Sequence, residues 1–421
     1  MDDAAQDFKA DARAAAYATP LADINVGDPE IFRSNTWEPL FERLRNEDPV
    51  HWTRSTRYGD FWSITKYDHI LEVDTNHQVF SSEASLGGIT IFGEGGPEGM
   101  LPMFIAMDPP KHDVQRKTVS PIVSPANLAN MEPIIRERAG KILDELPIGE
   151  TFDWVDRVSM ELTTQMLATL FDFPFEERRK LTWWSDVVTA VPGFGVVDTM
   201  EEKQAGIREC FEYFTRLWNE RVNAPPKGDL ISMLAHGEAT RNMDAREYNG
   251  NVLLLLVGGN DTTRNSISGG LVALNQNPDQ YAKLRANPEL VSSMVPEIIR
   301  WQTPLAHMRR TAVADFEFHG KTIRKGDKVI MWYASGNRDE EAIETPNQFI
   351  IDRERPRHHM AFGFGIHRCV GNRLAEMQLR IVWEEILKRF PVVELAGEPS
   401  RVYSCFVKGY DHVPVRIPAR Y

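Results

Sequence analysis

The chain of 421 residues carries 48 Lys and Arg against 61 Asp and Glu, which gives a formal net charge of −13 at pH 7. This charge excludes a general nucleic-acid binder, because the phosphate backbone is also negative. Three cysteines cannot form a disulfide framework in so long a chain, and their odd number fits a reducing compartment. A hydrophobic content of 42% is typical of a soluble globular protein, here long enough to bury a sizeable cofactor.

The beginning of the chain does not have the pattern of a targeting signal. Residues 1–20 open with acidic side chains and contain no apolar core, so we expect a flexible tail or a short helix. The most apolar run, residues 252–257, is far shorter than the roughly 20 residues that span a bilayer. These features predict a cytoplasmic protein without an integral membrane anchor.

The periodicity of apolar residues predicts a mainly helical chain with a small β region. No repeat or linker-like block divides the sequence, so we expect a single domain over residues 1–421. In chain order, the expected elements are a hairpin over 51–65, a long loop over 85–103, a helix that starts near 107–110, helical sequence over 133–223 with a break at 191–195, helices over 247–275 and 284–302, short strands over 313–329 with turns at Gly320 and Gly326, and a helix over 372–390.

The segment from Phe362 to Gly371 reads FGFGIHRCVG and places one cysteine, Cys369, among three glycines. A lone cysteine is usually a small buried hydrophobe. Here the cysteine directly precedes a predicted helix, whose N-terminus favours a thiolate. A single thiolate is poorly suited to an iron–sulfur or structural zinc site, which collects several ligands, but it suits the one axial position of a haem.

The spacing of Phe362, Gly365, Cys369 and Gly371 resembles the haem-binding loop of the cytochromes P450. The resemblance implies a mainly α cytochrome P450 fold with a small β region, in which one large domain buries the haem. It also implies haem b as cofactor, the Cys369 thiolate as the axial iron ligand and O2 as cosubstrate. The expected reaction is a monooxygenation, which inserts one oxygen atom into a C–H bond of a hydrophobic substrate.

Two functions of other classes use the same residues. A mononuclear zinc or non-haem iron site built from His358, His359, His367 and Cys369 would indicate a hydrolase, although it leaves the glycines unexplained. A haem-binding sensor or carrier would keep the cysteine loop without catalysis.

The helix expected over 247–275 contains the run GGNDTTRNSISGG from Gly258 onward, and its glycines, Asn, Asp and Thr are poor choices for a helix interior. A threonine hydroxyl bonded back to its own turn would give a bent helix without any catalytic role. The run also resembles the oxygen-binding groove of the family. The resemblance implies that Gly258 and Gly259 make room for dioxygen and that Asp261 and Thr262 are the catalytic acid–alcohol pair that relays protons.

Haem carries two propionates, so cations are expected at the rim of its pocket. His112 and Arg116 share one helix face at i, i+4. His367 is tied to the haem by its distance of two residues from Cys369, and Arg310 begins a strand that resembles a propionate-binding segment of the family. We expect these four residues to bind the propionates, with His359 as a fifth candidate.

Glu297 and Arg300 match the Glu-x-x-Arg pair of the family, which meets a second arginine from the segment before the cysteine loop. Arg353 is the candidate for that second arginine. One carboxylate shared by two guanidinium groups would form a rigid brace, so the expected role is structural.

The segments expected to line the pocket are apolar and indicate a hydrophobic substrate: residues 86–92, 190–197, 253–257, 304–306 and Phe406. The run from Gly258 and the run HMRRTA at 307–312 resemble bacterial terminal hydroxylases of alkanes and fatty acids. This resemblance implies terminal hydroxylation of a linear alkane or fatty acid. A terpenoid or other cyclic hydrophobic substrate is the alternative.

The family resemblance also implies the electron donors, a ferredoxin and an NAD(P)H-dependent ferredoxin reductase. A ferredoxin is usually acidic, so a chain of charge −13 needs a local basic patch for docking. The candidates are Lys117, Arg368, Arg373 and Arg380, and scattered solvated charges are the alternative. We expect a monomer that binds no nucleic acid.

Overall fold

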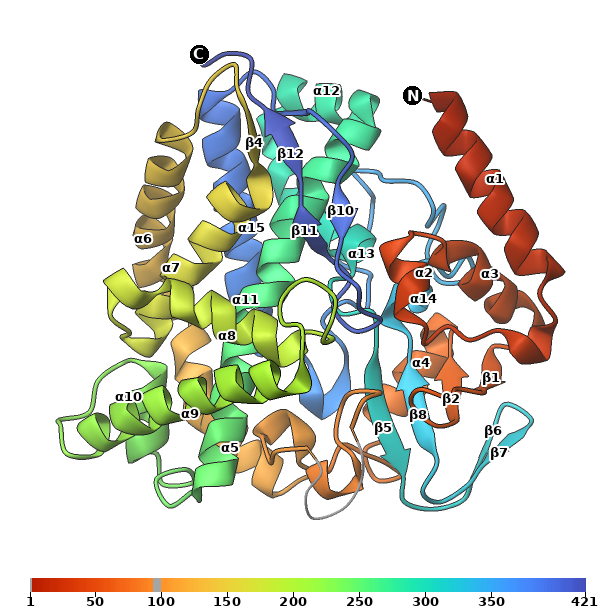
Figure 1. The fold of residues 1–421 in the computed structure, drawn as a ribbon, viewed down its shortest axis with the longest axis horizontal. Coiled ribbons are helices and arrows are strands. Elements are labelled where there is room, and N and C mark those ends of the chain that lie inside the picture. The colour runs from red at the N-terminus through yellow and green to blue at the C-terminus, as the bar shows by residue number, and fades with distance from the viewer. Residues whose placement is uncertain (1, 94–99) are drawn as a thin grey trace.

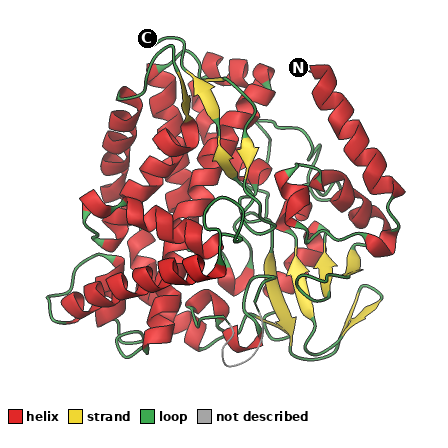
Figure 2. Ribbon diagram, in the orientation of Figure 1, coloured by secondary structure: helices red, strands yellow, loops and turns green. Residues whose placement is uncertain are grey.

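A computed structural model describes residues 2–93 and 100–421. Helices occupy one side of the molecule, and a small sheet with the N-terminal helices occupies the other (Figure 1; Figure 2). The helical side is built around the long α11 (Ala245–Gln276). Its other helices are α5 (Lys111–Val119), α6 (Pro125–Asp144), α7 (Glu161–Phe171), α8 (Arg179–Thr189), α9 (Met200–Val222), α10 (Leu230–His236), α12 (Pro278–Ala286), α13 (Val291–Gln302) and α15 (Asn372–Arg389).

The helix α11 confirms the element expected over 247–275. It begins at the N-cap Asp244, whose carboxylate accepts a hydrogen bond from the Glu247 N–H at 2.9 Å. Its 32 residues span about 48 Å and continue through the two glycines at 258 and 259. It packs against α7, α8, α13 and α15, so most of its faces are buried, whereas its end residues Ala245, Arg246 and Gln276 are exposed.

The single helix expected over 284–302 is wrong. The chain forms α12, a short 3₁₀ turn over Pro288–Leu290, and then α13. Pro288 provides the physical reason, because proline disfavours a helical conformation in the residue before it. Asn287 accordingly leaves the helical region with φ −139°, and its side chain accepts a hydrogen bond from the Glu289 N–H.

The main sheet has the strand order β1-β2-β8-β5-β3. The antiparallel pair β1 (Val50–Thr53) and β2 (Phe61–Ile64) confirms the expected hairpin, and β2 pairs in parallel with β8 (Lys328–Met331). The strands expected over 313–329 are also present, and Gly320 and Gly326 have positive φ at their turns. The remaining strands are β3 (Phe80–Ser81), β4 (Thr151–Asp153), β5 (Met308–Ala312), β6 (Phe316–Phe318), β7 (Lys321–Ile323), β9 (Glu394–Leu395), β10 (Ser400–Arg401), β11 (Tyr410–His412) and β12 (Pro414–Arg416).

The N-terminal segment forms the helix α1 (Asp2–Ala18), so the flexible-tail alternative is wrong. The helix is held on α3 (Trp37–Glu47) because Arg13 and Tyr17 both donate hydrogen bonds to Glu42, at 2.7 and 3.0 Å. Three shorter helices complete this side of the molecule: α2 (Pro29–Arg33), α4 (Tyr67–Thr75) and α14 (Tyr333–Gly336).

Segments that are distant in the sequence pack directly on each other, as α6 does on α15 and β2 on β8. The largest apolar core lies among the helices and includes the fully buried Trp154, Trp184 and Trp383. We propose on this basis that residues 1–421 form a single domain. Within the described part of the chain, every helix is too short or too polar to cross a membrane.

Candidate haem site and substrate cavity

The cysteine loop is a tight turn whose glycines are required by its geometry. Gly363 and Gly365 have φ of +65° and +63°, and a Cβ on Gly365 would lie 2.6 Å from the Asp74 carbonyl oxygen. The loop closes where the Cys369 N–H donates to the Phe362 carbonyl at 2.8 Å, and α15 then begins at Asn372. This turn presents Cys369 to the interior of the molecule.

Of the three cysteines, Cys369 lines a large internal cavity, whereas Cys210 and Cys405 are buried in the apolar cores. Desolvation by the surrounding protein raises the pKa of the Cys369 thiol. The Gly371 N–H and the guanidinium of Arg116 act in the opposite direction. The helix N-terminus therefore favours the thiolate, as expected, but desolvation outweighs it. A thiol that coordinates a metal ion is deprotonated outright.

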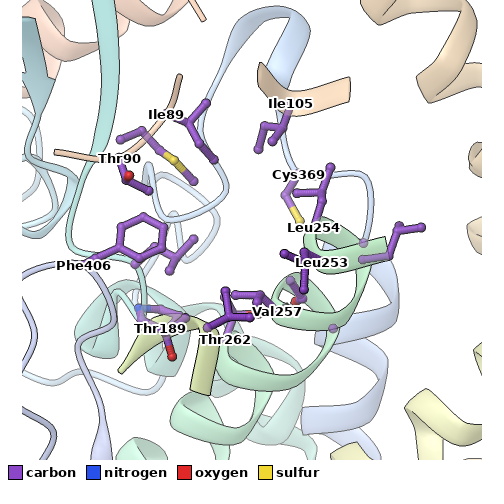
Figure 3. Close-up of a pocket in the computed structure, with 18 of the residues that line it drawn as sticks. Ile89, Thr90, Ile105, Thr189, Leu253, Leu254, Val257, Thr262, Cys369 and Phe406 are labelled. Atoms are coloured by element: carbon purple, nitrogen blue, oxygen red, sulfur yellow. Dashed lines mark hydrogen bonds between the residues drawn. The ribbon is translucent and has the colours of Figure 1, made fainter. Parts of the chain in front are cut away.

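The cavity has a volume of about 840 Å³. Figure 3 shows Cys369 beside Leu254 on one side, with Thr189 and Phe406 across the cavity from it. Each predicted apolar segment contributes residues to its lining, although other members of these segments, among them Leu86, Phe194, Leu256 and Ala306, do not line it. Their lining residues include Ile89, Thr90, Phe92, Ala190, Val191, Pro192, Leu253, Leu254, Val257, Pro304, Leu305 and Phe406.

Further lining residues were not predicted. Phe104 and Ile105 lie before α5, Met166 and Leu170 belong to α7, and Leu230 begins α10. Apolar periodicity marks such positions only as buried, so the sequence carries no signal that distinguishes a cavity wall from the core. The expected loop over 85–103 contributes Ile89, Thr90, Phe92, Gly93, Met100 and Met103, and its residues 94–99 lie outside the described part of the chain.

The two glycines of α11 differ in their surroundings. A Cβ on Gly258 would meet no atom within 4 Å, so this position opens directly onto the cavity. A Cβ on Gly259 would lie 2.7 Å from Leu167 Cδ2 of α7. The expectation that both glycines make room for dioxygen is therefore supported for Gly258, whereas Gly259 also serves the close packing of two helices.

The acid–alcohol pair is divided between the cavity and the protein interior. Thr262 lines the cavity, and its Oγ1 donates to the Gly258 carbonyl at 3.0 Å. Asp261 is fully buried and does not line the cavity. Its Oδ1 accepts hydrogen bonds from Asn260 and Arg264 at 2.9 and 3.0 Å, and its Oδ2 has no hydrogen-bond partner among the described residues.

Burial raises the pKa of Asp261 to about 6. Desolvation is the largest cause; the positive charge of Arg264 lowers the pKa, and the negative charge of Asp186 raises it again. Arg264 joins the two carboxylates, since it also forms an ion pair with Asp186 of α8 at 2.8 Å. Asp186 is partly exposed, so this chain of charges extends from the buried Asp261 toward solvent.

Three of the four expected propionate partners line the cavity with Cys369: Arg116, Arg310 and His367. Arg310 also pairs with the buried Asp74 at 2.7 Å, and Arg116 donates to the Arg368 carbonyl. Both ring nitrogens of the buried His367 lack a hydrogen-bond partner.

The fourth residue, His112, does not itself line the cavity. Its ring contacts that of His367 edge-on with centroids 4.5 Å apart, and its Nε2 also lacks a partner. Desolvation lowers the pKa of both histidines. A neutral His367 can donate one hydrogen bond to a ligand, whereas His112 donates from Nδ1 to Asp113 at 2.7 Å, so its Nε2 donates only when the ring is protonated. The fifth candidate, His359, is buried but does not line the cavity.

These features fit a haem. Buried nitrogens without partners and two arginines surround one accessible thiol, and a flat group with an axial metal and two carboxylates would satisfy them together. The alternative metal site is not supported. Among residues 2–93 and 100–421, no group of three or more His, Cys, Asp or Glu side chains could hold a metal ion.

The expected brace is confirmed by its geometry. The fully buried Glu297 accepts two hydrogen bonds from Arg300, both at 2.8 Å, and two from Arg353, at 3.1 and 3.3 Å. Desolvation acts to raise the pKa of Glu297, but the two guanidinium groups outweigh it and hold the pKa below its usual range. Arg300 also donates to the carbonyls of Asn337 and Pro346, so the brace ties α13 to the segment that leads to the cysteine loop.

Comparisons with known proteins agree with this site. The family model for cytochrome P450 matches residues 198–403. Linalool 8-monooxygenase of Pseudomonas putida is 37% identical over 93% of this chain and 98% of its own length. Steroid C26-monooxygenase of Mycolicibacterium smegmatis is 33% identical over 88% of each chain.

Solved structures give the same result. Cytochrome P450-153 from Novosphingobium aromaticivorans matches with a TM-score of 0.86 and 45% identity, over 93% of this chain and 98% of its own. CYP153D17 from Sphingomonas sp. PAMC 26605 matches with the same TM-score and coverage at 48% identity. The chain therefore belongs to the cytochrome P450 family. It is a monooxygenase of this family, which uses haem with an axial cysteine thiolate and O2.

Proposed function

We propose that Cys369 is the axial ligand of the haem iron and that His112, Arg116, Arg310 and His367 hold its propionates. When bound, the haem supplies the oxidative chemistry, in which one atom of O2 enters a C–H bond and the other leaves as water. The charged neighbours of the cavity on the Cys369 side and the unpartnered histidine nitrogens support this assignment.

We propose that Asp261 and Thr262 supply the two protons of this reaction. The Thr262 hydroxyl is the last donor before the cavity, and Asp261 can exchange its proton near neutral pH because its pKa is about 6. Asp186 and Arg264 connect that carboxyl with the surface region of α8.

For the substrate, we propose the chain end of a linear hydrophobic molecule, an alkane or a fatty acid. The observation that carries this is the apolar cavity wall next to Cys369, to which α11 contributes the branched side chains Leu253, Leu254 and Val257 (Figure 3). Branched side chains beside the reactive position leave less room for the middle of a chain than for its methyl terminus. The names of the two curated relatives also specify single positions, carbon 8 of linalool and carbon 26 of a steroid, which are terminal methyl carbons.

Product analysis on linear alkanes and fatty acids tests this proposal. With O2, a ferredoxin and an NAD(P)H-dependent reductase, we expect hydroxylation mainly at the terminal carbon. Leu254→Ala should widen the approach and move product toward in-chain carbons. Leu271→Ala, which removes a buried leucine of the same helix away from the cavity, should lower stability without moving the position of attack. In-chain products from the unmodified enzyme would overturn the proposal.

A branched terpenoid is the second candidate substrate, because the 37% identical relative is a linalool 8-monooxygenase. Linalool in the same product assay distinguishes the two. Faster turnover of linalool than of any linear chain would favour the terpenoid.

For electron delivery, we propose a ferredoxin that docks on a basic patch near the cysteine loop. Lys117, Arg368 and Arg373 are exposed. Arg380 is half-buried and forms ion pairs with Glu132 and Glu384, so it contributes less than expected to such a patch. Reversing the charge of Lys117 and Arg373 together should raise the ferredoxin concentration needed for half-maximal turnover, and an unchanged value would contradict the docking site.

A further inference from the structure

The cavity walls carry four arginine or lysine side chains: Arg57, Arg116, Lys203 and Arg310. Arg116 and Arg310 belong to the group around Cys369. Within the described part of the chain, no aspartate or glutamate lines the cavity. Lys203 and Arg57 are therefore two positive charges on the cavity wall that the haem site does not account for.

Lys203 lies in the first turns of α9, after the loop that begins at Ala190. Its side chain is half-buried, and its ammonium group donates one hydrogen bond, to the Ala190 carbonyl at 2.7 Å. An ammonium has three donors, so further donors are available to a ligand. No carboxylate of the described residues lies within ion-pair distance of it. Ala190 follows Thr189, which lies across the cavity from Cys369 (Figure 3).

Arg57 reaches the cavity from the turn between β1 and β2. Its guanidinium donates to the Tyr403 hydroxyl at 2.9 Å and lies 5.5 Å from the ring centroids of Tyr403 and Tyr58. It forms no ion pair with a described residue. Tyr403 stacks on Phe194 with ring centroids 3.7 Å apart, and Phe194 belongs to the loop between Ala190 and α9, so Arg57 belongs to the same far end of the cavity as Lys203.

We propose that Lys203 and Arg57 form a carboxylate subsite at the far end of the cavity, so that the substrate is a linear monocarboxylic acid whose methyl end points to Cys369. This subsite rests on the proposed function. Of the two linear substrates proposed there, an alkane and a fatty acid, it favours the fatty acid. Lys203 is a half-buried cation without a counter-ion among the described residues, and a charge-assisted hydrogen bond to a carboxylate offsets the cost of its desolvation; Arg57 is exposed at the cavity wall and adds a second donor of positive charge. The apolar walls between the two ends bury the methylene chain.

Dissociation constants for the haem-loaded enzyme test the subsite, measured for dodecanoic acid and for its uncharged methyl ester. Lys203→Met should weaken binding of the acid by about tenfold, the loss of one charge-assisted hydrogen bond, and leave binding of the ester within about twofold. Lys203→Arg should retain most of the acid affinity. Arg57→Met should act in the same direction as Lys203→Met.

Arg208→Met is the matched control, because Arg208 is an exposed cation of the same helix that does not line the cavity. It should leave both constants unchanged. Equal effects of Lys203→Met on acid and ester, or no effect on either, would overturn the subsite while the proposed terminal hydroxylation stands. If the unmodified enzyme bound neither dodecanoic acid nor its ester, the proposed function itself would fail.

Discussion

Thr262 and Asp261 are consecutive residues of α11, yet only Thr262 lines the cavity. The Thr262 hydroxyl donates to the Gly258 carbonyl one turn earlier, while the Asp261 carboxyl is fully buried against Asn260 and Arg264. Adjacent residues of a helix point about 100° apart, which is why neighbours in sequence face different surroundings. In the relay that we propose, the protons therefore pass from an interior carboxyl to a hydroxyl at the cavity wall.

Thr262→Ala should uncouple the reaction without disturbing the haem. The Thr262 hydroxyl is the donor that faces the cavity, so its loss leaves O2 reduction without controlled proton delivery, and electrons go to hydrogen peroxide. We expect the carbon-monoxide spectrum of the reduced enzyme to be retained and the yield of product per NADH to fall by about tenfold or more. Thr262→Ser, which keeps a hydroxyl, is the control. An unchanged product yield per NADH would refute the role of Thr262.

Asp261→Asn should change the pH dependence of stability. The folded-state pKa of Asp261, about 6, lies above its ordinary value of 3.8, so this group stabilises the fold below pH 4 and loses that contribution as the pH rises to 6. The asparagine variant does not ionise. Its unfolding free energy relative to the parent enzyme should thus rise between pH 4 and 6 and stay constant above, by a total on the order of 1–3 kcal/mol. Urea unfolding at several pH values measures this difference.

The same substitution should lower turnover about a hundredfold, because a proton donor is lost. A difference in unfolding free energy that does not vary with pH would show that the Asp261 carboxyl titrates in its ordinary range in the folded state.

Gly258→Ala and Gly259→Ala should have opposite effects on stability. A methyl group on Gly258 meets open space, so the gain in helix propensity should stabilise the protein by up to about 1 kcal/mol. A methyl group on Gly259 meets Leu167 Cδ2 at 2.7 Å, so overpacking should cost about 1–3 kcal/mol. The gain in helix propensity offsets only part of this cost. Denaturant unfolding measures both, and substrate affinity should fall for Gly258→Ala because its methyl group occupies the cavity. Equal stability changes would contradict the different surroundings of the two glycines.

Glu297→Gln should strongly destabilise the fold. It removes the negative charge shared by Arg300 and Arg353 and leaves a fully buried guanidinium uncompensated, at a cost of about 3–5 kcal/mol. Glu137→Gln breaks an exposed ion pair with Lys141, which solvent screens, and should leave the stability almost unchanged. Thermal unfolding and haem retention of the two variants provide the comparison. Similar midpoints would mean that the brace contributes no more than a surface pair.

Much of the architecture follows from local signals. The pattern over 247–275 predicts α11, and the alternation over 51–65 predicts the β1–β2 hairpin. The glycine spacing around Cys369 and the Glu-x-x-Arg pair also predict the cysteine loop and the brace with Arg353, because tight turns and shared carboxylates require particular residue types at fixed separations. The helix break at Asn287–Pro288 follows from a local proline signal, which overrides the apolar periodicity of residues 284–302.

Other features depend on which surfaces meet in three dimensions. Apolar periodicity identifies a buried position but does not distinguish contact with another helix from exposure to a cavity, so the different surroundings of Gly258 and Gly259 and the cavity-lining role of Met166 were decided by tertiary packing. The same holds for charges. In the sequence, Lys203 cannot be distinguished from an ordinary surface lysine. Only the folded chain places it at the wall of an apolar cavity.

The sequence by itself determined the family, the mainly helical fold and the cysteine that faces the cavity, since each is encoded in residues close together in the chain. Only the tertiary structure decided that Asp261 lies behind the cavity wall, that His112 contacts His367 and that His359 does not line the cavity. Desolvation sets the pKa of Asp261 and opposes the thiolate of Cys369, and it depends on atoms brought together from the whole chain.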